Sequence, residues 1–160
     1  MKSKQLQELK AECNICKACE LHSSRNNIVF ADGNPKTAKI LLIGEAPGEE
    51  EDKQGKPFVG DAGKNLNKYL SKAGISRQDD IFMINTIKCR PPKNRKPKKP
   101  EKDACREFLY RQIDIIAPKI IILCGGTALN EFTKGEKITE VHGKEFEINI
   151  LNKTYKAIPI

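Results

Sequence analysis

Five of the six cysteines in this sequence have the spacing of a metal site. These five are Cys13, Cys16, Cys19, Cys89 and Cys105. The first three form a CxxCxxC run, and the last two end the segment CRPPKNRKPKKPEKDAC. Clustered thiolates hold zinc or an iron–sulfur cluster, and the spacing alone neither chooses between them nor says which two N-terminal cysteines ligate. The bacterial ferredoxin run would need a cysteine where Ser23 stands, and zinc ribbons usually supply two CxxC pairs. Cys124, which ends an apolar run, is expected to be a small buried core residue.

A second chemical signal is the acidic segment GEAPGEEEDKQGKPFVG, residues 44–60, in an otherwise basic chain. Its acids are Glu45, Glu49, Glu50, Glu51 and Asp52. Acidic runs are usually solvated loops, but the density of glycine and proline here indicates a shaped backbone. Phe58 lies in its middle and is either a core plug or a platform on which a flat ring stacks.

The segment between Cys89 and Cys105 is basic and rich in proline. It is either a solvated loop or, if both ends are fixed by a metal centre, a rigid edge that binds phosphates. We favour the second interpretation. The whole chain of 160 residues carries a net charge of +8, which also favours a polyanionic partner. No apolar run has the length of a membrane span or a signal peptide, so we expect a cytoplasmic protein without a membrane partner.

These residues must be positioned by alternating strands and helices. Apolar runs predict strands at 40–43, 81–87, 119–124 and 154–160, and helical patterns fall at 61–74, 101–117 and 127–132. Residues 138–151 are ambiguous, a hairpin being one interpretation. The order predicts an α/β fold with a small, mostly parallel four-stranded sheet. The acidic segment then leaves the carboxyl end of the first strand, where open α/β sheets bind their ligands.

The motifs CKACELH, LLIGEAPGEEED, GKPFVGDAGK, INTIKCRPPKNRKP and AIPI together resemble the family 4 uracil-DNA glycosylases. The resemblance runs from about residue 6 to the last residue. It implies one domain over residues 1–160 with a three-layer α/β/α sandwich, a monomer, and a [4Fe–4S] cluster at one side. It also implies that Cys16, Cys19, Cys89 and Cys105 are the cluster ligands, which leaves Cys13 spare.

The resemblance further implies roles in excising a flipped uracil from DNA. Glu45 and the Ala46 backbone are expected at the attacking water and the base edge, beside Gly44. Glu51 is expected near C5 of the base, where it helps to exclude thymine. The remaining acids are expected at the rim of the site.

Two more groups of residues have implied roles. Phe58 would stack on the uracil ring. Asn85 would pair with the imide edge of uracil, and cytosine presents the reverse pattern of donors and acceptors at that edge. The DNA backbone is expected to contact four residues at the start of the basic segment, namely Lys88, Arg90, Lys93 and Arg95.

The favoured function is therefore a uracil-DNA glycosylase of base excision repair, a hydrolase of N-glycosyl bonds that is associated with the nucleoid during repair. In the family, a His-Pro-Ser element and a terminal helix follow the last strand, and this sequence ends at Ile160, where that element should begin. The alternative is therefore a non-catalytic uracil- or DNA-binding module, or an inactive truncated fragment of such an enzyme. An electron-transfer or cluster-storage protein is a third hypothesis, but it gives the acidic segment and Phe58 no task.

Overall fold

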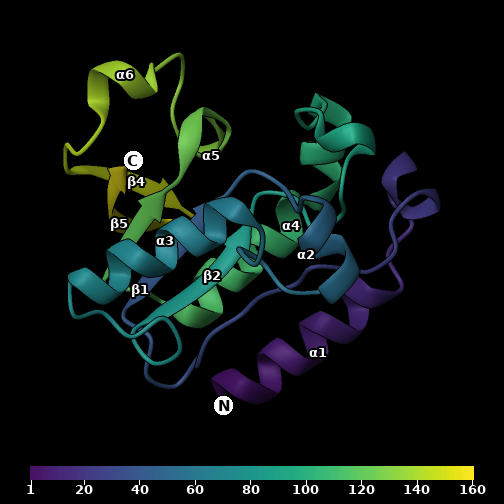
Figure 1. The fold of residues 1–160 in the computed structure, drawn as a ribbon, viewed down its shortest axis with the longest axis horizontal. Coiled ribbons are helices and arrows are strands. Elements are labelled where there is room, and N and C mark those ends of the chain that lie inside the picture. Colours follow the sequence, from purple (N-terminus) through teal and green to yellow (C-terminus); the bar gives the residue numbers. More distant parts are fainter.

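A five-stranded sheet runs through the computed structural model, which describes residues 1–160 (Figure 1). The strands are β1 (Ile40–Gly44), β2 (Ile81–Asn85), β3 (Ile120–Leu123), β4 (Phe146–Ile150) and β5 (Lys153–Pro159), in the order β2-β1-β3-β5-β4. The four predicted strands are present and run parallel. The prediction of only four was wrong, because β4 pairs antiparallel with β5 at one edge. Leu151 and Asn152 connect these two strands with φ of 50° and 62°, values suited to a tight hairpin.

The helices are α1 (Lys2–Asn14), α2 (Glu49–Gln54), α3 (Asp61–Lys72), α4 (Lys99–Ile116), α5 (Gly125–Phe132) and α6 (Ile138–Val141). The three predicted helices correspond to α3, α4 and α5 with small shifts of their ends. The sequence patterns did not predict α1, α2 or α6. None of the helices combines the length and hydropathy that crossing a membrane requires.

Helices cover both faces of the sheet, which confirms the three-layer sandwich. Leu41 and Ile43 of β1 point into the larger core cluster, which also contains residues of α1 and α4. Leu42, between them, points to the opposite face and packs with Leu70 of α3. Because β1 is buried on both faces, it forms a continuous apolar run instead of an alternating pattern.

The register of the parallel strands aligns their carboxyl ends. Gly44, at the end of β1, pairs with Asn85 at the end of β2, and Ile43 pairs with Leu123 at the end of β3. The segments that follow these three strands therefore start side by side. The acidic segment follows β1, and the basic segment that begins at Cys89 follows β2.

Candidate functional site

A hollow of about 290 Å³ opens at the carboxyl edge of the sheet. Its lining comes from the ends of β1 and β2, the start of α3, and the loop before α3. The lining residues are Gly44, Glu45, Ala46, Glu51, Phe58, Gly60, Asp61, Ala62, Gly63, Asn85 and Cys124. The structure thus brings to one hollow all six residues that sequence analysis placed at the base and its water.

Close contacts at Gly44 shape the inner part of this hollow. A Cβ atom at this position would lie 2.5 Å from Oδ1 of Asn85 and 2.6 Å from Cζ of Phe58. The aromatic ring and the side-chain amide therefore converge over a residue that has no side chain. Asn85 itself is only 3% exposed. A flat, polar ring is the kind of ligand that such a pairing of aromatic face and amide would accept.

The acidic segment is not an irregular loop, because four of its acids occupy the first turn of α2. Carboxylates are favoured there by the partial positive charge of a helix N-terminus. Glu49 and Glu50 are exposed, and both pair with Lys53 at 2.8 and 3.4 Å. The expectation that most acids lie at the rim holds for these two.

Asp52 corrects that expectation, since it is buried with 1% exposure. Its carboxylate accepts hydrogen bonds from the backbone N–H groups of Asn26 at 2.9 Å and Asn27 at 3.1 Å. It also accepts one from Nδ2 of Asn26 at 2.6 Å. Asp52 therefore ties the segment after the N-terminal cysteines to α2, and its role is structural.

Glu45 contacts a residue that the sequence analysis did not select. One of its carboxylate oxygens accepts a hydrogen bond from the hydroxyl of Thr127 in α5. Thr127 follows Gly125 and Gly126, at the end of a third parallel strand. This position after a predicted parallel strand could have pointed to Thr127, because all three strand ends share one edge of the sheet.

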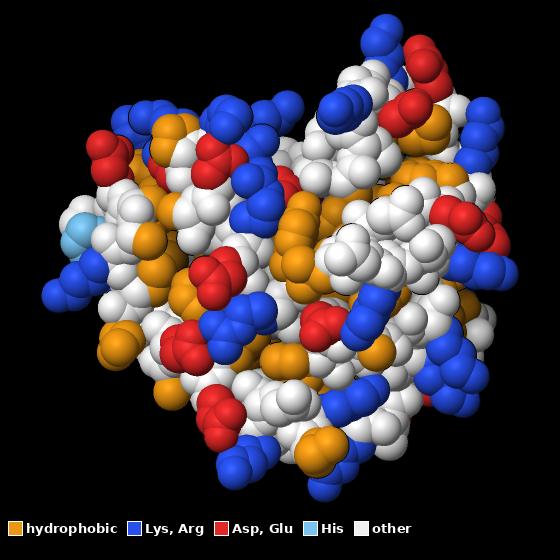
Figure 2. All heavy atoms as spheres, turned by 180° about the vertical axis from the view of Figure 1, so that it is seen from behind, with side chains coloured by type: hydrophobic (Ala, Val, Ile, Leu, Met, Phe, Trp, Pro, Cys, Tyr) orange, Lys and Arg blue, Asp and Glu red, His pale blue; other side chains and the backbone are white.

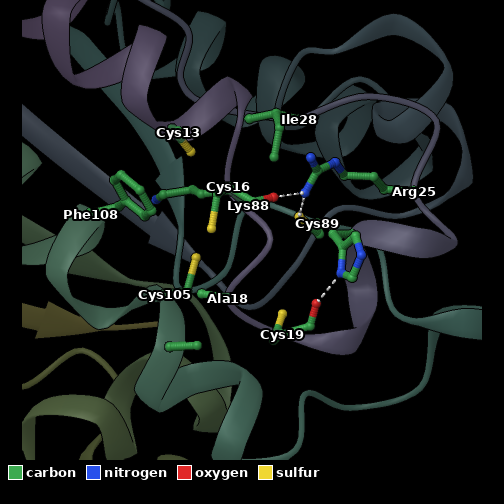
Figure 3. Close-up of a pocket in the computed structure, with 12 residues that line it drawn as sticks. Cys13, Cys16, Ala18, Cys19, Arg25, Ile28, Lys88, Cys89, Cys105 and Phe108 are labelled. Atoms are coloured by element: carbon green, nitrogen blue, oxygen red, sulfur yellow. Dashed lines mark hydrogen bonds between the residues drawn. The ribbon is translucent and has the colours of Figure 1, made fainter.

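Five of the six cysteines line a separate cavity (Figure 3). Its lining residues are Cys13, Cys16, Ala18, Cys19, His22, Arg25, Ile28, Lys88, Cys89, Ala104, Cys105 and Phe108. The four predicted cluster ligands lie here together with Cys13. Cys124 lies elsewhere: it packs against the core cluster of Leu42 and Leu70, but it is only half-buried and also lines the hollow, so its prediction as a buried core residue holds only in part.

Two cationic side chains accompany the thiols. Arg25 donates through Nη1 to Sγ of Cys89 at 3.4 Å and to the carbonyl of Cys16 at 2.9 Å. Lys88 is 1% exposed and donates through Nζ to the carbonyl of Asn85 at 2.6 Å. Burial lowers the pKa of Lys88 to about 8, against the opposing effect of the nearby Cys105, Cys13 and Cys89. The prediction that Lys88 contacts the DNA backbone is wrong, because its ammonium group points inside.

The donor set fits an iron–sulfur cluster. Thiolates are the ligands that such clusters use, and positive charge beside them offsets the negative charge of a thiolate-bound cluster. The thiols share one cavity, although no three or more His, Cys, Asp or Glu side chains are arranged closely enough to hold a single metal ion. Burial there raises the pKa of Cys89 to about 11, although Arg25 opposes it, and raises that of Cys13 to about 12. Binding of a cluster by these thiols would therefore release protons.

The basic segment is anchored at the beginning of α4. Glu101, 3% exposed, accepts hydrogen bonds from Arg95 at 2.6 and 3.0 Å and from the backbone N–H of Lys98 at 2.8 Å. The positive charge of Arg95 is thus largely balanced by Glu101. Arg90 donates a hydrogen bond of 2.7 Å through Nε to Oδ1 of Asn94. Lys93 is exposed. Figure 2 shows Lys and Arg side chains crowded along the upper edge of one face, over the beginning of α4.

Glu101→Gln is expected to flatten the dependence of stability on acid pH. The hydrogen bonds from Arg95 hold the pKa of Glu101 below its ordinary value of 4.5. The ion pair therefore stabilises the fold fully above that value, and its contribution is lost as the pH falls through the lower folded pKa. Urea unfolding between pH 3 and 7 measures this, with the exposed Glu107→Gln as control. Parallel pH curves for Glu101→Gln and the wild type would contradict the assignment.

The geometry defines an α/β protein with a base-sized hollow at the carboxyl edge of its sheet and a thiol-lined cavity nearby. Residues 30–159 match the family model of the uracil DNA glycosylase superfamily. The chain is 48% identical over 134 residues to the type-4 uracil-DNA glycosylase of Thermotoga maritima, covering 82% of this chain and 69% of that protein.

Two archaeal relatives extend the match. The type-4 uracil-DNA glycosylase of Sulfurisphaera tokodaii is 47% identical, over 88% of this chain and 66% of that protein. That of Archaeoglobus fulgidus is 39% identical, over 97% of this chain and 79% of that protein. The matches thus span between 66% and 79% of the length of these three relatives. The chain belongs to the uracil DNA glycosylase superfamily.

Proposed function

We propose that this chain is a uracil-DNA glycosylase that hydrolyses the N-glycosidic bond of a flipped-out uracil and leaves an abasic site in DNA. The observation that carries the proposal is the convergence of Glu45, Phe58 and Asn85 on one hollow at the carboxyl edge of the sheet. The type-4 names of the relatives support the same activity. The experiment that tests it is excision of uracil from an oligonucleotide by the purified chain.

Phe58 and Asn85 recognise the base in this proposal. The ring of Phe58 stacks on the uracil face, and the amide of Asn85 pairs with the imide edge by donating and accepting together. As the glycosidic bond breaks, negative charge develops on the base, and a preorganised amide donor stabilises it. Cytosine presents the reverse pattern and leaves that amide mispaired.

Glu45 acts on the deoxyribose in this proposal. A carboxylate near the deoxyribose stabilises the positive charge of an oxocarbenium-like transition state, and it can orient the water that attacks C1′. The hydroxyl of Thr127 holds one oxygen of this carboxylate and leaves the other available. The backbone of Ala46 borders the same water and base edge. Glu51, which lines the hollow, is proposed to limit the space for a methyl group at C5.

The cofactor in this proposal is a [4Fe–4S] cluster held by Cys16, Cys19, Cys89 and Cys105. When bound, such a cluster joins the four thiolates covalently and provides a centre whose redox potential depends on hydrogen bonds to sulfur. Arg25 supplies one such bond to Cys89. Lys88, which lines this cavity and precedes the proposed ligand Cys89, donates to the carbonyl of Asn85 and so supports the end of β2.

The partner is uracil-containing DNA, and the chain would act in the cytoplasm at the nucleoid. The phosphate contacts in this proposal are Arg90 and Lys93, together with the exposed Lys96 and Lys98 of the same segment. Arg95 is kept as a weaker contact because Glu101 already binds its guanidinium group. Such contacts would make binding strongly dependent on salt.

Gly44→Ala is expected to lower uracil excision by about a hundredfold, the scale for a misplacement of about 1 Å at a reacting centre. The new methyl group would meet Oδ1 of Asn85 and the ring of Phe58 where they converge. Single-turnover rates measure the effect. The matched control is Gly126→Ala, because a Cβ atom there has nothing within 4 Å. If folded Gly44→Ala excised uracil at the wild-type rate, the base could not bind in this hollow as proposed.

A further inference from the structure

The backbone of Phe58 is strained. Its φ is +54°, in the left-handed region that residues other than glycine rarely adopt. The surrounding chain approaches closely, since a Cβ atom at Gly63 would lie 2.0 Å from the carbonyl oxygen of Phe58. Strain of this kind persists only where neighbouring groups hold the residue in place.

Two charged side chains hold the four residues from Pro57 to Gly60. On one side, Arg77 donates to the carbonyl of Pro57 at 2.8 Å and to that of Phe58 at 2.7 Å. On the other side, Glu51 accepts from the N–H groups of Val59 at 2.9 Å and Gly60 at 2.5 Å. The peptide groups around Phe58 are therefore fixed by opposite charges.

Arg77 is itself fixed by the remaining donors of its guanidinium group. Nε and Nη2 donate to Asp32 at 3.4 and 3.3 Å, and Nη1 donates to Asn67 at 2.8 Å. With the two carbonyls, these bonds use all five N–H donors of an arginine. Asp32 is joined to β2 through paired backbone bonds with Met83 of 3.0 and 2.8 Å. Arg77, which holds the backbone of Phe58, is thus itself fixed to the sheet through Asp32. A lysine has only three donors and cannot make these five hydrogen bonds.

We propose that Arg77 is a positioning residue that presets the ring of Phe58 as the platform for the base. The inference rests on the proposed function, because it takes the base to stack on Phe58. Arg77 does not line the hollow, so it acts only through the backbone of residues 57–60. Without it, the strained backbone would relax, and the binding of a base would have to restore the ring position.

The test compares Arg77→Lys with Arg111→Lys, which alters another paired arginine, on α4. Inhibition by free uracil reports the platform, and affinity for uracil-free duplex reports the rest of the surface. Arg77→Lys is expected to raise the inhibition constant of free uracil about tenfold, within the range for losing a stacking contact. Its affinity for plain duplex should stay unchanged, and Arg111→Lys should change neither value. An inhibition constant for uracil within twofold of wild type would overturn the proposal.

Hydrogen exchange separates this inference from the proposed function. The amides of Val59 and Gly60 should exchange about tenfold faster in Arg77→Lys, and this readout needs no catalysis. Should the wild type release no uracil, the proposed function fails while the exchange still decides whether Arg77 positions the segment. If Arg77→Lys does not fold, Asp32→Asn releases the anchor and carries the same two measurements. Wild-type exchange in the folded variant would overturn the proposal.

Discussion

Replacing Asn85 with alanine is expected to lower the single-turnover rate of uracil excision by about 10²- to 10³-fold, the scale for losing one preorganised donor. Asn85 is nearly buried at the end of β2 and stands beside the ring of Phe58 over Gly44. Its position is fixed by the pairing of β1 with β2 rather than by a loop, so the donor is held before the base arrives. Removing it would deprive the leaving uracil of a preorganised hydrogen-bond donor.

Asn130→Ala is the control for this prediction, since Asn130 is exposed on α5. It should excise uracil at the wild-type rate. Asn85→Ala should still bind uracil-free duplex as the wild type does, because the basic segment is untouched. A rate within about threefold of wild type would contradict the role given to Asn85, being less than 1 kcal/mol of transition-state stabilisation.

Replacing Cys105 with serine is expected to abolish iron binding and to lower the melting temperature. The four proposed ligands join the N-terminal segment, the end of β2 and the first half of α4, which are far apart in the sequence. The proposed cluster would cross-link these segments covalently. Losing roughly 4 kcal/mol, the scale for removing a native covalent cross-link, would lower the melting temperature of a chain this size by about 8–16 °C. Iron content, visible absorption and thermal unfolding measure these effects.

The other cysteines provide matched controls. Cys124→Ser lies outside the thiol cavity and should keep its iron. Cys13→Ser should also keep it, because Cys13 is spare in the proposed ligand set although it lines the same cavity. Loss of iron from Cys13→Ser, or retention in Cys105→Ser, would require a different choice of ligands.

The sequence was sufficient for the core of the fold. Continuous apolar runs predicted β1, β2 and β3, because strands buried on both faces have few polar residues. The order of strands and helices then placed the acidic segment at the carboxyl edge. The edge strand β4 remained ambiguous since it alternates only partly and depends on its hairpin with β5.

The helices that were missed share a physical cause. α1 has only Leu6, Leu9 and Cys13 buried, and it is stabilised by packing against α4 instead of by its own pattern. α2 is six residues long, too short for a periodic signal. Its acids are explained by the helix terminus and by the bonds of Glu51 and Asp52, which only the folded chain reveals.

The candidate site was predicted as a set of residues but not as a set of contacts. Gly44, Phe58 and Asn85 could be selected because each belongs to a recognisable motif. Arg77 and Thr127 lie in segments without such motifs, and their importance arises from partners 19 and 82 residues away. The burial of Lys88 was equally hidden, because lysine is rarely buried and the segment that follows Cys89 is basic.

The most direct test of the account is single-turnover cleavage of a uracil-containing oligonucleotide by the purified, iron-loaded chain. Alkali would reveal abasic sites, and a thymine-containing oligonucleotide of the same sequence would be the control. We expect strand breaks at uracil alone, and their loss in Asn85→Ala. Tight binding of uracil-containing DNA without any break would contradict it and would favour a non-catalytic binding module.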